Sequence, residues 1–172
     1  VNGQVWDLNR PIYEDAAIKL LSWDDAEGKN TFWHSSAHLM AEAVENIFPG
    51  VKFWVGPALE KGFYYDMDLG DKKLNEEDLA ALEKKMNELA KKNSNYERKE
   101  MPKAEAIRYF TSKNDEYKLD LLHNLVDGEI TFYSQGNFTD LSRGPHIPHP
   151  GLIKAIKLTN IASAYWKGDE KN

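Results

Sequence analysis

Cysteine is absent from the 172 residues of this sequence. Its absence excludes disulfide bonds and removes the commonest ligand of structural zinc sites, so a metal ion would need histidine and oxygen ligands. Long apolar runs are also absent. No stretch approaches the roughly 18 residues of a membrane span, and no charged start followed by an apolar segment marks a signal peptide. We therefore expect a cytoplasmic protein with no membrane partner.

Positive charge is scarce as well. Lysine and arginine number 22 against 28 acidic residues, which gives a formal net charge of -6. A free-standing, nonspecific nucleic-acid binder is normally basic, so this class is excluded, whereas a nucleic acid delivered by another domain is compatible with the composition. A hydrophobic content of 41% is enough to bury one substantial core in a chain of this length.

Apolar periodicity and turn signals predict an irregular order of strands and helices. Asn2-Gly3, scattered apolar residues and Pro11 favour short strands over 1–23, and the polar run 24–30 is typical of a link, which places a domain boundary at residue 27. Helices are predicted over 34–48, after Asn75, after Pro102 and over 117–125, and strands over 51–57, 62–66, 96–100, 130–133, 138–141 and 153–158. Because these elements do not alternate regularly, the predicted fold class is α+β.

Two pairs of polar side chains share a spacing of four residues. His34 and His38 lie on one face of the predicted helix near its N-terminal end, and Ser142 and His146 flank a Gly-Pro turn. Alone, the histidine pair is a weak signal, since surface and cap histidines are commoner. The second pair strengthens it, because glycine and proline hold His146 on a rigid loop between two predicted strands. Together the pairs predict a metal site or a pocket that holds a hydrolytic water.

Five motifs carry a family resemblance. They are H-S-S-A-H at 34–38, G-P-A-L-E-K-G-F-Y-Y-D at 56–66, E-Y-K at 116–118, D-L-S-R-G-P-H at 140–146 and A-Y-W-K-G-D at 164–169. In this order they resemble the editing domain of bacterial threonyl-tRNA synthetases. The opening segment V-N-G-Q-V-W-D-L is similar to the end of the ubiquitin-like TGS domain that precedes it, and 168–172 are similar to the start of the linker to the family's catalytic domain.

The resemblance implies a fold, a reaction and partners. The fold would be a mostly antiparallel sheet packed by helices around a central cleft (28–172), preceded by part of a small β-grasp-like domain (1–27). The chain would be a fragment of a threonine–tRNA ligase that hydrolyses Ser-tRNA(Thr) by attack of water on the aminoacyl ester. Proofreading is needed because the one methyl group that separates serine from threonine is worth only about 1–3 kcal/mol of discrimination. The implied partners are tRNA(Thr) mischarged with serine and the remaining synthetase domains, in a full-length homodimer that also binds ATP.

The same match implies an editing pocket. Its catalytic residues would be His34, His38, Lys118 and His146, and its substrate-binding residues Tyr65, Asp140, Ser142 and Arg143. We expect His34 to position or activate water, Lys118 to steady developing negative charge, and Asp140 to hold the ammonium or hydroxyl of the substrate. The other two histidines would shape and polarise the pocket.

Simpler structural roles stay open for four of these residues. Lys118 is also typical of a solvated helix lysine, and Tyr65 is typical of a core residue. Asp140 fits a turn cap. Arg143 fits either a phosphate contact or an anchor of its own loop.

Ser142 marks a departure, because the family has cysteine at this position. A neutral hydroxyl is a poor zinc ligand, so we expect no cofactor in this chain. Hydrolysis by water stays compatible, since the hydroxyl can hydrogen-bond water or substrate, whereas no nucleophile elbow surrounds the serine to make it a covalent nucleophile. Two alternatives remain: a zinc-binding module built on His34, His38 and His146, and a structural module that binds the tRNA acceptor end with editing impaired by Ser142.

Overall fold

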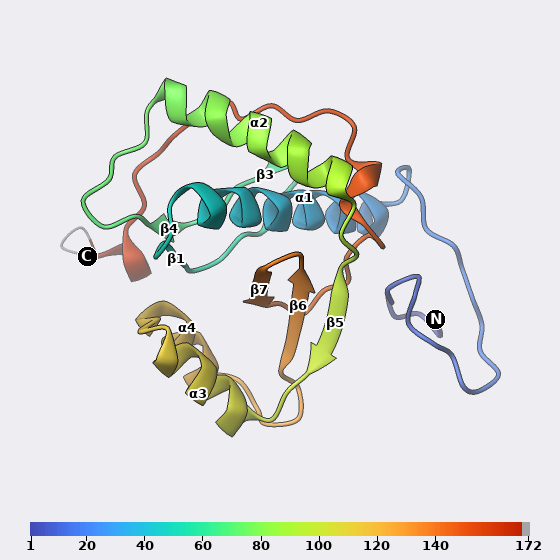
Figure 1. Ribbon diagram of the computed structural model, residues 1–172. Helices are drawn as coiled ribbons and strands as arrows, with labels where there is room; N and C mark the ends of the chain where they lie inside the picture. Colours follow the sequence, from blue (N-terminus) through green and yellow to red (C-terminus); the bar gives the residue numbers. More distant parts are fainter. Residues whose placement is uncertain (170–172) are drawn as a thin grey trace.

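A long central helix organises the computed structural model, which describes residues 1–169. Helix α1 (Ala26–Ile47) runs between helix α2 (Glu76–Lys92) on one side and a three-stranded sheet on the other (Figure 1). The predicted α+β class is confirmed. Although α1 has 22 residues, no helix within residues 1–169 is both long and apolar enough to cross a membrane.

The start of α1 differs from the prediction. The polar run expected as a link forms its first turns, with Asp25 as the N-cap and Glu27 in the first turn, where an acidic side chain interacts favourably with the helix dipole. The Asp25 carboxylate also accepts from the backbone N–H of Ser22 at 2.9 Å. The consequence is that His34 and His38 stand in the middle of a long helix, not near its N-terminal end.

Helix α2 begins as its sequence predicts. The Asn75 side chain accepts from the backbone N–H of Asp78 at 3.0 Å, and the Asp78 carboxylate accepts from the backbone N–H of Asn75 at 2.9 Å, which completes a capping box. Leu82, Met86 and Leu89 form the buried stripe of this helix and belong to the same apolar core as α1. This packing makes α1 a helix covered on both sides.

The main sheet is antiparallel and carries two different faces. Its strands are β5 (Glu97–Glu100), β6 (Thr131–Gln135) and β7 (Phe138–Leu141), in the order β5-β6-β7. Tyr133 pairs with Asp140, and Phe132 pairs with Leu141. Because successive side chains alternate between faces, the first pair faces α1 and the second faces away from it. The sheet therefore presents polar groups and the buried ring of Phe138 to the central helix, and apolar groups to the opposite layer.

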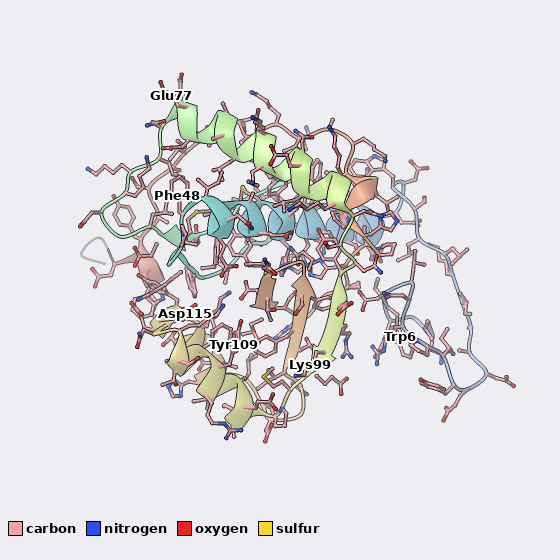
Figure 2. All side chains as sticks on the ribbon, in the orientation of Figure 1. Trp6, Phe48, Glu77, Lys99, Tyr109 and Asp115 are labelled. Atoms are coloured by element: carbon pink, nitrogen blue, oxygen red, sulfur yellow. The ribbon has the colours of Figure 1, made fainter. Side chains whose placement is uncertain are left out.

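Helices α3 (Lys103–Ser112) and α4 (Glu116–His123) cover the second face of the sheet (Figure 1). Phe110 of α3 stacks on Phe132 of β6 with ring centroids 5.6 Å apart. Leu122 of α4 is buried in the same cluster. In Figure 2, Tyr109 and Asp115 mark α3 and the start of α4 at this side of the molecule. Two apolar clusters thus lie on either side of the sheet.

A ribbon of short strands covers α1 from another side. Strand β1 (Lys52–Phe53) pairs with β4 (Met67–Asp68), and β2 (Ala58–Leu59) pairs with β3 (Gly62–Phe63). Between these ladders the backbone N–H of Trp54 donates to the carbonyl of Asp66 at 2.9 Å. The strands predicted over 51–57 and 62–66 are present, although each is divided into two short pieces. The ribbon places Tyr65 against α1.

Two predicted strand regions are wrong. Within the described structure no strand forms before Ala26 or over 153–158, and the loop after β7 leads to the 3-10 helix η1 (Pro150–Leu152), with η2 (Trp166–Gly168) near the end. A strand needs a neighbour for its ladder bonds. The first segment instead closes on itself between Asn2 and Ala17, and the backbone N–H of Leu158 donates to the Glu83 side chain on α2 at 2.7 Å. Apolar residues of 153–158 pack on the core without a strand partner, whereas large apolar residues of the first segment, such as Leu8 and Leu20, are exposed.

Candidate active site

Three histidine rings meet between α1 and the loop after β7. The ring centroids of His34 and His38 are 5.0 Å apart, those of His34 and His146 4.5 Å, and those of His38 and His146 4.3 Å. One nitrogen from each ring lies within 4.8 Å of the other two. The fold therefore brings together the two motifs that share the four-residue spacing.

Burial keeps these imidazoles uncharged. His38 is 1% exposed and His146 is 2% exposed. Burial lowers the pKa of His38 well below its usual value, and the neighbouring His146, His34 and Lys118 lower it further. Burial likewise depresses the pKa of His146, with His34 adding to the effect. The pKa of half-buried His34 is lowered by burial and partly restored by Asp140. At neutral pH all three rings are bases.

The hydrogen-bond network assigns the tautomer of His146. Ser35 Oγ donates its single proton to the carbonyl of Thr31 at 2.7 Å and accepts from the backbone N–H of Ile147 at 3.0 Å. It also lies 2.9 Å from His146 Nδ1. Because the hydroxyl proton is already used, Nδ1 carries the proton and donates to Ser35. The lone pair of Nε2 then faces Ser142 Oγ at 3.3 Å.

A buried ion pair adjoins the histidines. Lys118 Nζ lies 2.9 Å from Asp140 Oδ1, and each side chain is 3% exposed. The same ammonium donates to Asp140 Oδ2 at 3.0 Å and to the carbonyl of Trp54 at 2.8 Å. The hydroxyl of Tyr65 donates to Asp140 Oδ2, and the backbone N–H of Leu141 donates to Asp140 Oδ1 at 2.8 Å. Both carboxylate oxygens are therefore engaged by the protein.

Tyr65 joins this pair to the histidines. Its ring centroid is 6.1 Å from that of His38, while its hydroxyl reaches Asp140. A cavity of about 210 Å³ borders Lys118 and Asp140 and is also lined by Glu45 of α1 and Lys113 after α3. The pair thus borders the cavity and is joined through Tyr65 to the histidine cluster.

Arg143 is the one predicted site residue that lies apart. The other predicted site residues are all near one another: His34, His38, Tyr65, Lys118, Asp140, Ser142 and His146. Arg143 is exposed and makes no hydrogen bond or ion pair with any residue in 1–169. Lys118 is not the solvated helix lysine that its type suggests, because Asp140 and the Trp54 carbonyl bind its ammonium inside the protein.

The sequence analysis missed several residues that contact the site, among them Ser35, Tyr133 and Asp7. Ser35 lies inside the H-S-S-A-H motif and binds His146. Tyr133 contacts the His146 ring edge-on, with centroids 4.4 Å apart. Asp7 accepts from the backbone N–H of His146 at 2.8 Å. Ser35 could have been found from its place between the two histidines, whereas nothing in the local sequence signals Asp7 or Tyr133.

The three histidines are suitable zinc ligands, but a structural zinc site needs a fourth ligand. Three neutral imidazoles are good ligands, and the buried His38 Nδ1 has no hydrogen-bond partner within residues 1–169. Ser142 places a hydroxyl oxygen beside His146 Nε2, but this hydroxyl already accepts from the backbone N–H of Gly144 at 3.1 Å. A fourth ligand of thiolate or carboxylate type is absent from the group that the described residues form.

Comparisons with known proteins agree with the motif pattern. Residues 130–172 match the protein family described as the threonyl and alanyl tRNA synthetase second additional domain. The chain is 59% identical over 172 residues to a threonine–tRNA ligase of Cytophaga hutchinsonii, which covers 100% of this chain. The chain is homologous to a segment of the threonine–tRNA ligases.

Other ligases of this group show the same relationship. A threonine–tRNA ligase of Porphyromonas gingivalis is 59% identical over 172 residues and one of Bacteroides fragilis is 51% identical over 170 residues, each covering 99% of this chain. The chain spans about a quarter of these relatives: 27% of the Cytophaga ligase and 26% of each of the other two. The match therefore concerns one region of a much longer enzyme.

Proposed function

We propose that this chain hydrolyses the ester of Ser-tRNA(Thr), as the editing part of a threonine–tRNA ligase. One observation supports this most: three uncharged imidazoles adjoin a buried lysine–aspartate pair in a single cluster. Hydrolysis of an ester by water needs a base for the water, a cation or donor for the oxyanion, and a proton donor for the departing ribose oxygen. The cluster contains groups suited to each task.

His34 is the residue that we assign to the water. It is the least buried of the three histidines, and its ring makes no hydrogen bond to any residue in 1–169. Its lowered pKa, caused by burial, leaves the ring free to accept a proton at neutral pH. A positioned imidazole of this kind takes the proton of the attacking water as the bond to the carbonyl carbon forms. The resulting imidazolium then gives this proton to the ribose oxygen as the ester C–O bond breaks.

Lys118 is the group that we assign to developing negative charge. Its ammonium borders the cavity and is held in place by Asp140 and the carbonyl of Trp54. A fixed cation in a largely water-excluded site stabilises an oxyanion more than one in bulk water does. Since both oxygens of Asp140 are engaged, a substrate ammonium or hydroxyl would share this carboxylate with Lys118 and Tyr65.

The proposed editing activity would belong to a longer ligase. The parts of the relatives that lie beyond this chain would carry aminoacylation and ATP binding, and the whole would be a homodimeric ligase working on tRNA(Thr) in the cytoplasm. Arg143, exposed and next to Ser142 in sequence, is suited to a phosphate of the tRNA end. Editing would compensate for a synthetic site that discriminates poorly against the smaller serine.

The specificity is tested by comparing release of amino acid from Ser-tRNA(Thr) and from Thr-tRNA(Thr). We expect serine to be released about 10-fold to 200-fold faster, the range that one methyl group provides. As a control, 3′-O-seryl-adenosine removes any dependence on the body of the tRNA. Equal rates for the two amino acids would overturn the specificity. Binding of the tRNA end with no hydrolysis of any of these esters would favour the structural module.

A zinc-binding module is the second candidate. The unpartnered, buried Nδ1 of His38 favours it. The bond between Ser142 and His146 Nε2 opposes it, because this nitrogen would have to leave the hydroxyl in order to bind a metal.

Zinc analysis separates the two candidates. After incubation with zinc and desalting, we expect far less than one ion per chain, and we expect a chelator to change neither melting temperature nor ester hydrolysis. Ser142→Cys should retain more zinc, because a thiolate replaces a poor ligand. One tightly held ion per unchanged chain, with loss of stability on chelation, would establish the zinc module instead.

A further inference from the structure

The N-terminal segment reaches the histidine cluster through a single carboxylate. Asp7 is 9% exposed although it belongs to a stretch without helix or strand. Its Oδ1 accepts from the backbone N–H of His146 at 2.8 Å, across 139 residues of sequence. Its Oδ2 accepts from the hydroxyl of Tyr133 at 2.7 Å. One side chain therefore binds both the loop after β7 and the neighbouring strand β6.

Tyr133, which Asp7 binds, also packs against the loop after β7. Its ring meets that of His146 at an interplanar angle of 72° and a centroid distance of 4.4 Å. Its hydroxyl end is pressed against Gly144, because a Cβ atom added there would lie 2.0 Å from the tyrosine oxygen. Gly144 also has a φ of +67°, which glycine adopts readily. The loop is thus shaped around the phenol that Asp7 holds.

The other bonds of His146 fix its ring but not its backbone. Ser35 and Ser142 bind the two ring nitrogens, and Tyr96 stacks on the ring at 5.1 Å and 11°. Among residues 1–169, Asp7 alone accepts from the backbone N–H of His146. If Asp7 is removed, this buried N–H loses its acceptor and the Tyr133 hydroxyl loses its partner at the same time. Both losses loosen the base from which the imidazole projects.

We infer that Asp7 is a positioning residue that holds His146 and Tyr133 in the geometry needed for hydrolysis, so that the first segment of the chain completes the site. This inference builds on the proposed ester hydrolysis. It also gives the domain boundary predicted at residue 27 a functional meaning, since a chain cut there would keep its histidines and lose the support behind one of them. Asp7 touches no substrate and acts only through the loop and the tyrosine.

The test compares Asp7→Ala, Asp7→Asn and Asp15→Ala in the full chain. Asp15 is exposed on the same segment and serves as the matched control. With 3′-O-seryl-adenosine, we expect Asp7→Ala to lower kcat about 10-fold to 100-fold with KM nearly unchanged. Asp7→Asn retains an acceptor for the His146 N–H and should recover much of the loss. Asp15→Ala should behave as the unchanged chain does.

A second readout does not depend on hydrolysis. The nitrogen resonances of histidine report the tautomer, and in the unchanged chain we expect His146 protonated on Nδ1. In Asp7→Ala these resonances should shift towards a mixture of tautomers or broaden, whereas those of exposed His123 should stay in place. Unchanged His146 resonances together with a kcat equal to that of Asp15→Ala would overturn the inference. If the unchanged chain hydrolyses no ester, the resonances still decide whether Asp7 positions His146.

Discussion

Asp140→Ala is expected to lower the free energy of unfolding by about 3–5 kcal/mol, the range for a broken buried ion pair. Lys118 and Asp140 are each only 3% exposed at the side chain. Without the carboxylate, the ammonium keeps one protein acceptor, the carbonyl of Trp54, and the Tyr65 hydroxyl loses its partner. Urea denaturation followed by circular dichroism measures the loss.

Two further variants distinguish charge from packing. Lys118→Met combined with Asp140→Leu removes both charges, and we expect it to recover much of the stability, because apolar residues often replace a buried pair at little cost. Lys19→Met breaks the ion pair with Asp25, in which the lysine side chain is 75% exposed, and should have no measurable effect. If Asp140→Ala cost no more than Lys19→Met, the pair would contribute nothing to the fold and the argument for a fixed cation at Lys118 would fail.

His34→Ala is expected to slow hydrolysis of the seryl ester by about 100-fold to 10,000-fold, the usual contribution of a positioned general base. Because His34 is half-buried and makes no hydrogen bond within residues 1–169, its removal should affect stability much less than the rate. Single-turnover assays with Ser-tRNA(Thr) measure the effect. His123→Ala, at an exposed histidine on α4, is the control. Activity within twofold of the unchanged chain would remove His34 from the mechanism.

We expect the rate of ester hydrolysis to decline in acid solution. Burial lowers the pKa of His34, so the ring stays a base below pH 6.5, and the rate should decline only in more acid solution. Stability falls in the same direction. The buried rings of His38 and His146 have folded-state pKa values well below 6.5, so the unfolded chain binds more protons as the pH drops past that value. Folding must therefore be monitored at each pH used for the rate.

Local sequence predicts a helix or strand correctly when the residues that determine it lie within the element itself. The start of α2 at Asn75 depends only on residues within one helical turn, and the helix begins there as predicted. Alternation of apolar residues likewise places β6 and β7 within a few residues of their observed ends. Prediction fails at Asp25 because a polar run serves equally as a linker and as the first turn of a helix. It fails over 153–158 because burial against α2 and burial in a sheet select the same apolar residues.

The sequence was sufficient to predict which types of residue form the site. Histidines four residues apart on a helix must share a face, and the motifs around Lys118, Asp140 and His146 identify their family. The ionisation states and the contacts of these residues could not be predicted from the sequence. Only the packed structure buries the imidazoles and so lowers their pKa values, and only it places Asp140 between Lys118 and Tyr65.

The sequence by itself therefore determined which groups this protein can use, because side-chain chemistry and helical spacing are local properties. The tertiary structure decided which of these groups are neutral, which are paired, and what holds them in place. Asp7 shows the reason most clearly, since its two bonds cross 139 and 126 residues of chain. Contacts of that range depend on how whole segments pack, and no periodicity or motif near Asp7 encodes them.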